Sequence, residues 1–382
     1  MANVWITDMI KKFIIFIFLL LLPTVIFGQE YPEENQLNQD VVFKAKVIEI
    51  IEQKNIVRED GSVSIQQKIR LKGINGDWKD KEVIFDGTEF DVLSGGEYSL
   101  GDKVLVNRII DTNGKEDFYI IGFSRAGYIY WIALLLALVV IIIGKFKGVR
   151  ALAVLLLTFV IILKFIIPKI LSGGDPLLVS IIGSFFIIIL SVYITEGLKR
   201  TSTISIISIL ISLTATGFLS VWFSAITKLT GFASEDVMYL VGSMGGNINL
   251  KGLLLAGIII GTLGILDDVV ISQVVLVKEL KLANPEFSKY KIYRQAMRVG
   301  VSHLSSMINT LFLAYAGASL PLLILFSVGE PPFLTFSQVI DNEMIATEIV
   351  RTIVGSIGLV IAVPISTFLA VNFITKKVKS KE

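Results

Sequence analysis

The sequence contains no cysteine and only one histidine, His303. The lack of cysteine excludes disulfide frameworks, thiolate metal sites and cysteine nucleophiles, and a lone histidine excludes a multi-histidine metal site. Charged residues are scarce as well, at 18% of the 382 residues, compared with about 25% in a typical soluble domain. The net charge of +2 gives no indication of a nucleic-acid partner. We therefore predict no cofactor, and the sequence leaves any metal unknown.

Hydrophobic residues, by contrast, make up 53% of the chain, and the mean hydropathy is +0.74. They gather in runs of about 20 residues, the length that crosses a hydrocarbon core of about 30 Å. The sequence thus predicts an α-helical polytopic membrane protein whose first partner is the lipid bilayer. Seven spans are expected, at residues 127–144, 149–168, 176–196, 202–224, 251–276, 300–328 and 348–374.

Residues 1–28 have the pattern of a signal sequence. Lys11 and Lys12 precede a short apolar run from Phe13 to Phe27, and the small residue Gly28 follows it. Because Ile26 is bulky for its place in a cleavage site, an uncleaved N-terminal anchor remains the alternative. Under either interpretation the residues that follow are exported.

Residues 29–125 are expected to form an extracytoplasmic, all-β domain, a small barrel or sandwich of OB-like type. Short runs of β-favouring residues are separated by turn signals such as Asp60-Gly61 and Asn113-Gly114. No catalytic constellation is visible among them. The strands are expected at residues 41–52, 62–72, 82–85, 103–110 and 118–123.

The Lys and Arg residues of the loops predict how residues 126–382, the expected seven-helix domain, are oriented. One set of loops, together with the C-terminal tail, carries fifteen of them, and the opposite set carries four. Since the cytoplasmic loops of membrane proteins are enriched in positive charge, we predict a multi-pass plasma-membrane protein with a cytoplasmic C-terminus. Within the richer set, the segment Lys281–Arg298 is typical of a basic helix on the membrane surface.

Two adjacent aspartates, Asp267 and Asp268, interrupt the apolar fifth span. A charge at that depth costs about 2.5–3.5 kcal/mol on insertion scales, so such residues face a bundle interior or a cavity and are functional candidates by default. Neighbouring helical positions point about 100° apart, and Asp268 shares its face with Gly257, Gly261 and Gly264. That stripe predicts close helix packing, as in the Gly-x-x-x-Gly motif.

The sixth span is the natural partner of the aspartates, since Ser306, Asn309 and Thr310 give it a polar face. Two interpretations remain open. The carboxylates either bind or relay a cation or proton with these side chains, or they form interhelical hydrogen bonds that hold the bundle together. Catalysis is not predicted, because no nucleophile–base set is visible and the Gly-x-Gly-Asp motif of aspartyl intramembrane proteases is missing.

Two stretches, Gly261–Val269 (GTLGILDDV) and Met307–Gly317 (MINTLFLAYAG), resemble the YibE/F family of bacterial multi-pass membrane proteins. The resemblance implies the fold and the membrane location, and it brings no activity. The residues themselves suggest a transporter or permease component for a small solute or ion. The alternative is a non-transporting scaffold or sensor whose exported domain recognises a ligand. A second copy or a paralogous membrane protein is the expected protein partner.

Overall fold

The computed structural model describes residues 41–57, 63–88, 97–110, 114–232, 235–243, 248–329 and 334–374. The signal sequence predicted at residues 1–28 lies outside this part of the chain. The chain divides into two compact units, Met1–Leu134 and Leu135–Glu382. The domain boundary predicted at residues 125 and 126 stays a prediction.

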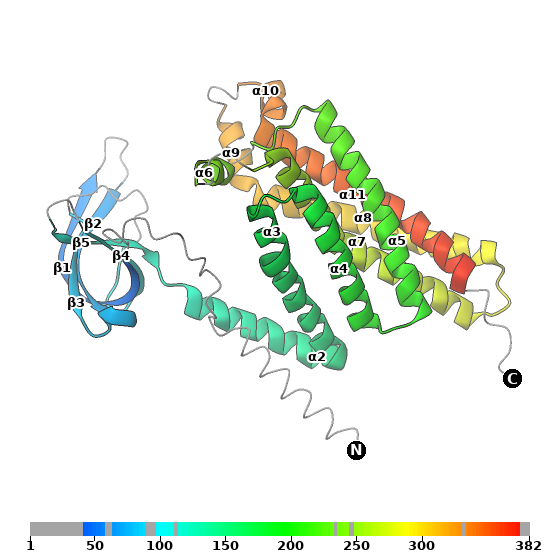
Figure 1. Cartoon of the computed structure of the whole chain (residues 1–382), viewed down its shortest axis with the longest axis horizontal. Coiled ribbons are helices and arrows are strands. Elements are labelled where there is room, and N and C mark those ends of the chain that lie inside the picture. The colour runs from blue at the N-terminus through cyan, green and yellow to red at the C-terminus, as the bar shows by residue number, and fades with distance from the viewer. Residues whose placement is uncertain are drawn as a thin grey trace, which may run out of the picture. The chain divides into compact units, whose positions relative to one another are not determined.

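The first unit is built on a five-stranded antiparallel sheet with the order β3-β2-β1-β4-β5 (Figure 1). All five predicted strands are confirmed, and β1 is longer than expected. In the described residues no backbone ladder joins the edge strands β3 and β5, so the sheet is an open half-barrel. The strands are β1 Val41–Val57, β2 Val63–Gly73, β3 Glu82–Asp86, β4 Lys103–Ile110 and β5 Glu116–Phe123.

Apolar side chains gather on one face of the sheet, because successive side chains of a strand point to opposite faces and the apolar residues alternate along the strands. Phe43, Ala45 and Val47 of β1 are all buried in this way. A single turn of 3₁₀-helix, Gly76–Trp78, covers part of that face. Its Trp78 stacks on Phe43 with the ring centroids 4.9 Å apart. The unit therefore has a small apolar core of its own.

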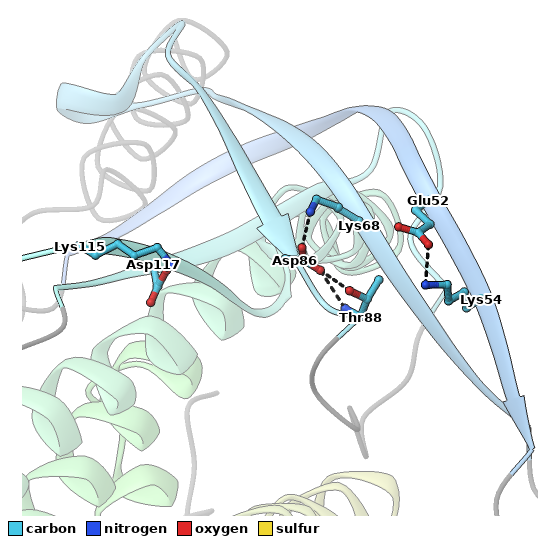
Figure 2. A network of polar contacts seen from close by, with 7 residues as sticks. All are labelled: Glu52, Lys54, Lys68, Asp86, Thr88, Lys115 and Asp117. Atoms are coloured by element: carbon cyan, nitrogen blue, oxygen red, sulfur yellow. Dashed lines mark hydrogen bonds and ion pairs between the residues drawn. The ribbon is translucent and has the colours of Figure 1, made fainter. Parts of the chain in front are cut away.

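Several ion pairs lie on the polar face and at the edges of this sheet. Figure 2 shows Asp86 at the end of β3 between Lys68 and Thr88, and the Thr88 hydroxyl donates to the Asp86 carboxylate at 2.5 Å. The Lys68 ammonium, and after it the Thr88 hydroxyl, lower the pKa of Asp86 to about 2. Lys54 pairs with Glu52 at 2.6 Å along β1. These contacts lie at the surface and show no catalytic geometry.

The second unit is helical, and five of its helices, α4, α5, α7, α8 and α11, pack together (Figure 1). Capping residues set where two of them begin. Asp175 accepts from the Leu178 amide at the start of α4, and Asn249 accepts from the Gly252 amide at the start of α7. The helices are α2 Ala126–Ile161, a π-helical turn Ile162–Ile166, α3 Ile167–Leu171, α4 Pro176–Glu196, α5 Arg200–Ile226, α6 Glu235–Ser243, α7 Leu250–Ala283, α8 Lys289–Ala318, α9 Leu320–Val328, α10 Phe336–Asp341 and α11 Glu343–Ile374.

In the described residues, five helices are long and apolar enough to cross a membrane, and a sixth span results if the bent pair α8–α9 is counted as one. The first of the five extends over 46 residues, Ala126–Leu171, more than twice the length that a bilayer requires. Within it Lys145 has non-helical backbone angles, φ 48° and ψ −128°. The α8–α9 pair bends by 66°.

Small residues let α5, α7 and α11 approach closely in the centre of the unit. A Cβ atom at Gly358 of α11 would lie 2.2 Å from the Thr216 Oγ1 of α5, and one at Gly355 would lie 3.5 Å from the Thr262 Oγ1 of α7. Buried hydroxyls such as that of Thr216 donate to the backbone carbonyl four residues earlier, at 2.8 Å. A hydroxyl bonded in this way enters the core without an unsatisfied hydrogen bond.

The basic segment Lys281–Arg298 is not a separate surface helix, so that expectation is wrong. Its first residues form the last turn of α7. This helix ends at Ala283, and the backbone of Asn284 is extended. Ser288 then caps α8 by accepting from the Lys291 amide. The positive charges thus sit on the ends of two core helices, because the apolar faces of α7 and α8 continue past the region that hydropathy alone assigns to the spans.

Candidate functional site

Helix α7 is the central element of the helical unit and carries both aspartates. It packs against α4, α5, α8 and α11. Asp267 follows its first residue, Leu250, by 17 positions, or about 26 Å along the axis at 1.5 Å per residue. Since α7 has 34 residues, the aspartates lie close to the middle of the helix.

Asp267 points toward α4. Its Oδ2 accepts a hydrogen bond from the Ser191 hydroxyl at 2.6 Å. Its Oδ1 is buried and has no hydrogen-bond partner among the described residues. The carboxylate therefore has one satisfied oxygen and one free acceptor inside the bundle. Sequence reasoning placed the partner of Asp267 on the sixth span and missed Ser191, whose one signal was a serine in an apolar span.

Helix α4 carries two further buried hydroxyls on the face of Ser191. Ser180 and Ser184 precede it by eleven and seven positions, spacings that keep side chains on one side of a helix. Both are fully buried, and neither hydroxyl has a partner among the described residues. Because buried polar groups are normally hydrogen-bonded, these two oxygens and the Asp267 Oδ1 are exceptions that share the α4–α7 region.

Asp268 points away from Asp267, as the 100° step between neighbouring positions requires. Its side chain is exposed, and it makes no hydrogen bond or ion pair within the described part of the chain. His303 of α8 interacts with it electrostatically, and so does Asp267. The two carboxylates therefore interact with each other but point in different directions, one into the bundle and one toward its surface.

The predicted polar partners on α8 lie on its exposed face. Ser306, Asn309 and Thr310 are all exposed, and Thr310 donates to the Ser306 carbonyl of its own helix at 3.0 Å. No hydrogen bond between described residues joins any of the three to Asp267 or Asp268. Their part in an ion site stays a prediction that the geometry does not support directly.

The glycine stripe of α7 is exposed too. A Cβ atom at Gly257 or Gly264 would meet nothing within 4 Å, and one at Gly261 would lie 3.3 Å from the Tyr315 hydroxyl of α8. The predicted close approach of a helix to this stripe is therefore not made by any described helix of the same chain.

Gln273 forms a buried polar junction that the sequence analysis did not single out. Its amide nitrogen donates to the Ala296 carbonyl of α8 at 2.9 Å and to the Thr367 hydroxyl of α11 at 2.7 Å. Gly300 leaves room for this amide, since a Cβ there would lie 2.8 Å from Gln273 Oε1. The signal that could have found it is a glutamine within an apolar run, six residues after Asp267.

A second cluster of polar side chains lies near the first turns of α7 and α11. Glu348 pairs with Arg351, three positions later on the same helix, at 2.9 Å. Both line a cavity of about 260 Å³, together with Thr347 and the first turns of α7. At the very start of α11, Glu343 accepts hydrogen bonds from the Thr230 and Gly231 amides and so ties the α5–α6 loop to α11.

No group of three or more histidines, cysteines or carboxylates in the described residues is arranged to hold a metal ion. What this arrangement offers chemically is a single buried carboxylate with a free oxygen, hydroxyls beside it, and a second carboxylate on the surface next to an imidazole. Groups of these kinds are chemically able to exchange protons or to contact a small cation, and this set includes no activated nucleophile.

Comparison with known proteins agrees with the motifs around these residues. A family model described as YibE/F-like protein matches residues 132–376, which include every helix from most of α2 to the end of α11. No curated protein and no solved structure shows significant similarity to the chain. Since the match extends over more than half of the sequence, this chain belongs to the YibE/F-like protein family.

Proposed function

We propose that the chain is an integral membrane protein that moves a small solute or ion, and that Asp267 takes up a proton or small cation during transport. The observation that carries the proposal is the state of its carboxylate. One oxygen accepts from Ser191, and the other is buried without a partner. Five or six apolar helices and the family membership are compatible with a membrane location.

The physical reason lies in the cost of placing a carboxylate there. At the centre of a spanning helix an aspartate costs about 2.5–3.5 kcal/mol on insertion scales, and such residues mark ion and proton pathways. A carboxylate that served only to join helices would be expected to have both oxygens hydrogen-bonded. The free Oδ1 of Asp267, with the unpartnered hydroxyls of Ser180 and Ser184 on the adjoining helix, leaves acceptors available for a passing ion.

The proposal includes a topology of seven spans with the N-terminal domain outside and the C-terminus in the cytoplasm. The break at Lys145 supports it, because it separates the 46-residue first segment into two stretches of spanning length. The bent α8–α9 pair supplies another span. An exported half-barrel that precedes the first span agrees with the signal-sequence pattern of residues 1–28 and with the distribution of Lys and Arg among the loops.

The test is the isosteric substitution Asp267→Asn in the full chain, purified and reconstituted into liposomes that contain a pH-sensitive dye. Asn keeps the shape and can still accept from Ser191, but it cannot exchange a proton at neutral pH or supply a charge. We expect proton-coupled or Na⁺ flux to fall at least about tenfold. Glu196→Gln, an acid-to-amide change at the end of α4, is the matched control and should keep the flux.

Each outcome decides between the alternatives. Asp267→Asn protein that reaches the membrane at the normal level and still conducts would contradict the proposal. Failure to accumulate would assign Asp267 a structural role in the bundle and would contradict it too. Under the scaffold or sensor alternative, removal of residues 41–123 abolishes function and Asp267→Asn is tolerated.

A further inference from the structure

The exposed stripe of α7 is unusual because α7 is otherwise covered by four helices. Gly257, Gly261, Gly264, Asp268 and Ser272 follow one another at steps of four, three, four and four, and all five are exposed. They extend for about 22 Å along one side of the helix at 1.5 Å per residue. This side of the central helix thus lacks a cover within the described part of the chain.

The shape of the stripe fits another helix. A Cβ atom added at Gly257 or Gly264 finds open space within 4 Å. The spacing of Gly257 and Gly261 is the small-x-x-x-small pattern that lets two helix backbones approach closely in a membrane. A second helix packs against such a groove through close backbone contacts that lipid chains do not reproduce.

The polar side chains beside the stripe also indicate a protein partner. Asp268 is exposed on it without a hydrogen bond, and α8 runs beside it, with Tyr315 next to Gly261 and His303 near Asp268. The neighbouring face of α8 exposes Asn309 as well. Hydrocarbon offers no partner for a carboxylate, an imidazole or an amide, so polar side chains at this depth face protein or water.

We infer that this surface, made by the α7 stripe and the polar face of α8, is the interface with a second copy of this chain. The surface is self-complementary, since the carboxylate of Asp268 accepts hydrogen bonds and the nearby imidazole of His303 has an N–H that donates them. A two-fold axis along the membrane normal brings equal depths together, and we expect it to place Asp268 of each copy opposite His303 of the partner subunit. The inference rests on the membrane location proposed above and is independent of transport.

The test exploits the lack of cysteine in the chain. Full-length Gly264→Cys and Ser272→Cys, each the sole cysteine in the protein, are oxidised mildly in native membranes and analysed on non-reducing gels. A disulfide forms only where two Cα atoms come within about 4.4–6.8 Å, so positions beside the two-fold axis report directly on the interface. Val360→Cys is the matched control, because it is exposed on α11 at a similar number of residues from the start of its helix.

We expect a disulfide-linked dimer in at least one stripe variant, reversed by reductant, and monomer in Val360→Cys. Monomers in both stripe variants would overturn the inference, and so would equal dimer yields at all three positions, which indicate random collision. A second measurement removes dependence on oxidation. The mass of the unmodified protein in lipid nanodiscs should be that of a dimer, and Gly264→Leu, which fills the groove, should shift it to monomer. Loss of transport in Asp267→Asn leaves both measurements unchanged.

Discussion

Gly358 offers the sharpest test of the helical core. A Cβ atom at this position would lie 2.2 Å from Thr216 Oγ1 and 3.3 Å from Thr216 Cβ. Thr216 has no room to withdraw, because its side chain is fully buried and its hydroxyl is bonded to the Ser212 carbonyl at 2.8 Å. Gly358→Ala should therefore force α5 and α11 apart.

The magnitude follows from two opposing terms. Overpacking a well-filled core typically costs about 1–3 kcal/mol, and replacing Gly by Ala within a helix returns up to about 1 kcal/mol. We expect a net loss of about 1–2 kcal/mol in the free energy of unfolding. In a Thr216→Ala background the clash with Oγ1 is absent, so the same Gly358→Ala change should be neutral or mildly stabilising.

The assay is reversible unfolding of the full chain in mixed detergent micelles, measured for wild type, both single variants and the double variant. Gly217→Ala on α5 is the control, because its Cβ would make an ordinary contact, 3.8 Å from Ile259 Cδ1. It should raise stability by up to about 1 kcal/mol. Equal stability of Gly358→Ala and wild type, or no coupling between positions 358 and 216, would refute the close α5–α11 crossing.

Two other predictions concern hydrogen bonds. Gln273→Leu removes two bonds and leaves the Thr367 hydroxyl with only its intrahelical partner, so we expect a loss of about 1–3 kcal/mol in the same unfolding assay; an unchanged protein would contradict the junction. In the β-sheet of the first unit, the Asp86 carboxyl accepts from Lys68 and then Thr88 and has a pKa of about 2. Its contribution to stability is present above about pH 4 and is lost as the pH falls through about 2, because the folded pKa is the lower one. Thr88→Ala should raise this pKa, as followed by carbon NMR of the Asp side chains; no change would contradict the contact.

Much of the architecture was determined by local pattern. Apolar runs of spanning length predict α-helices, because a helix satisfies its own backbone hydrogen bonds in lipid. Alternating apolar residues between turn signals predict β-strands. All five strands and the principal helices were therefore predicted near their positions. The same logic located the break near Lys145, between the spans expected at residues 127–144 and 149–168. The adjacent positions of the two aspartates already required that they point in different directions.

What lies opposite each residue was decided by the tertiary structure alone. Asp267 is bonded to Ser191, which precedes it by 76 positions, instead of the polar residues of α8. Periodicity gives the face of a helix but not the neighbour that covers it, since that depends on how α4, α7 and α8 pack. For the same reason the sequence could mark the stripe from Gly257 to Asp268 as a packing surface, and only the fold shows that no described helix of this chain occupies it.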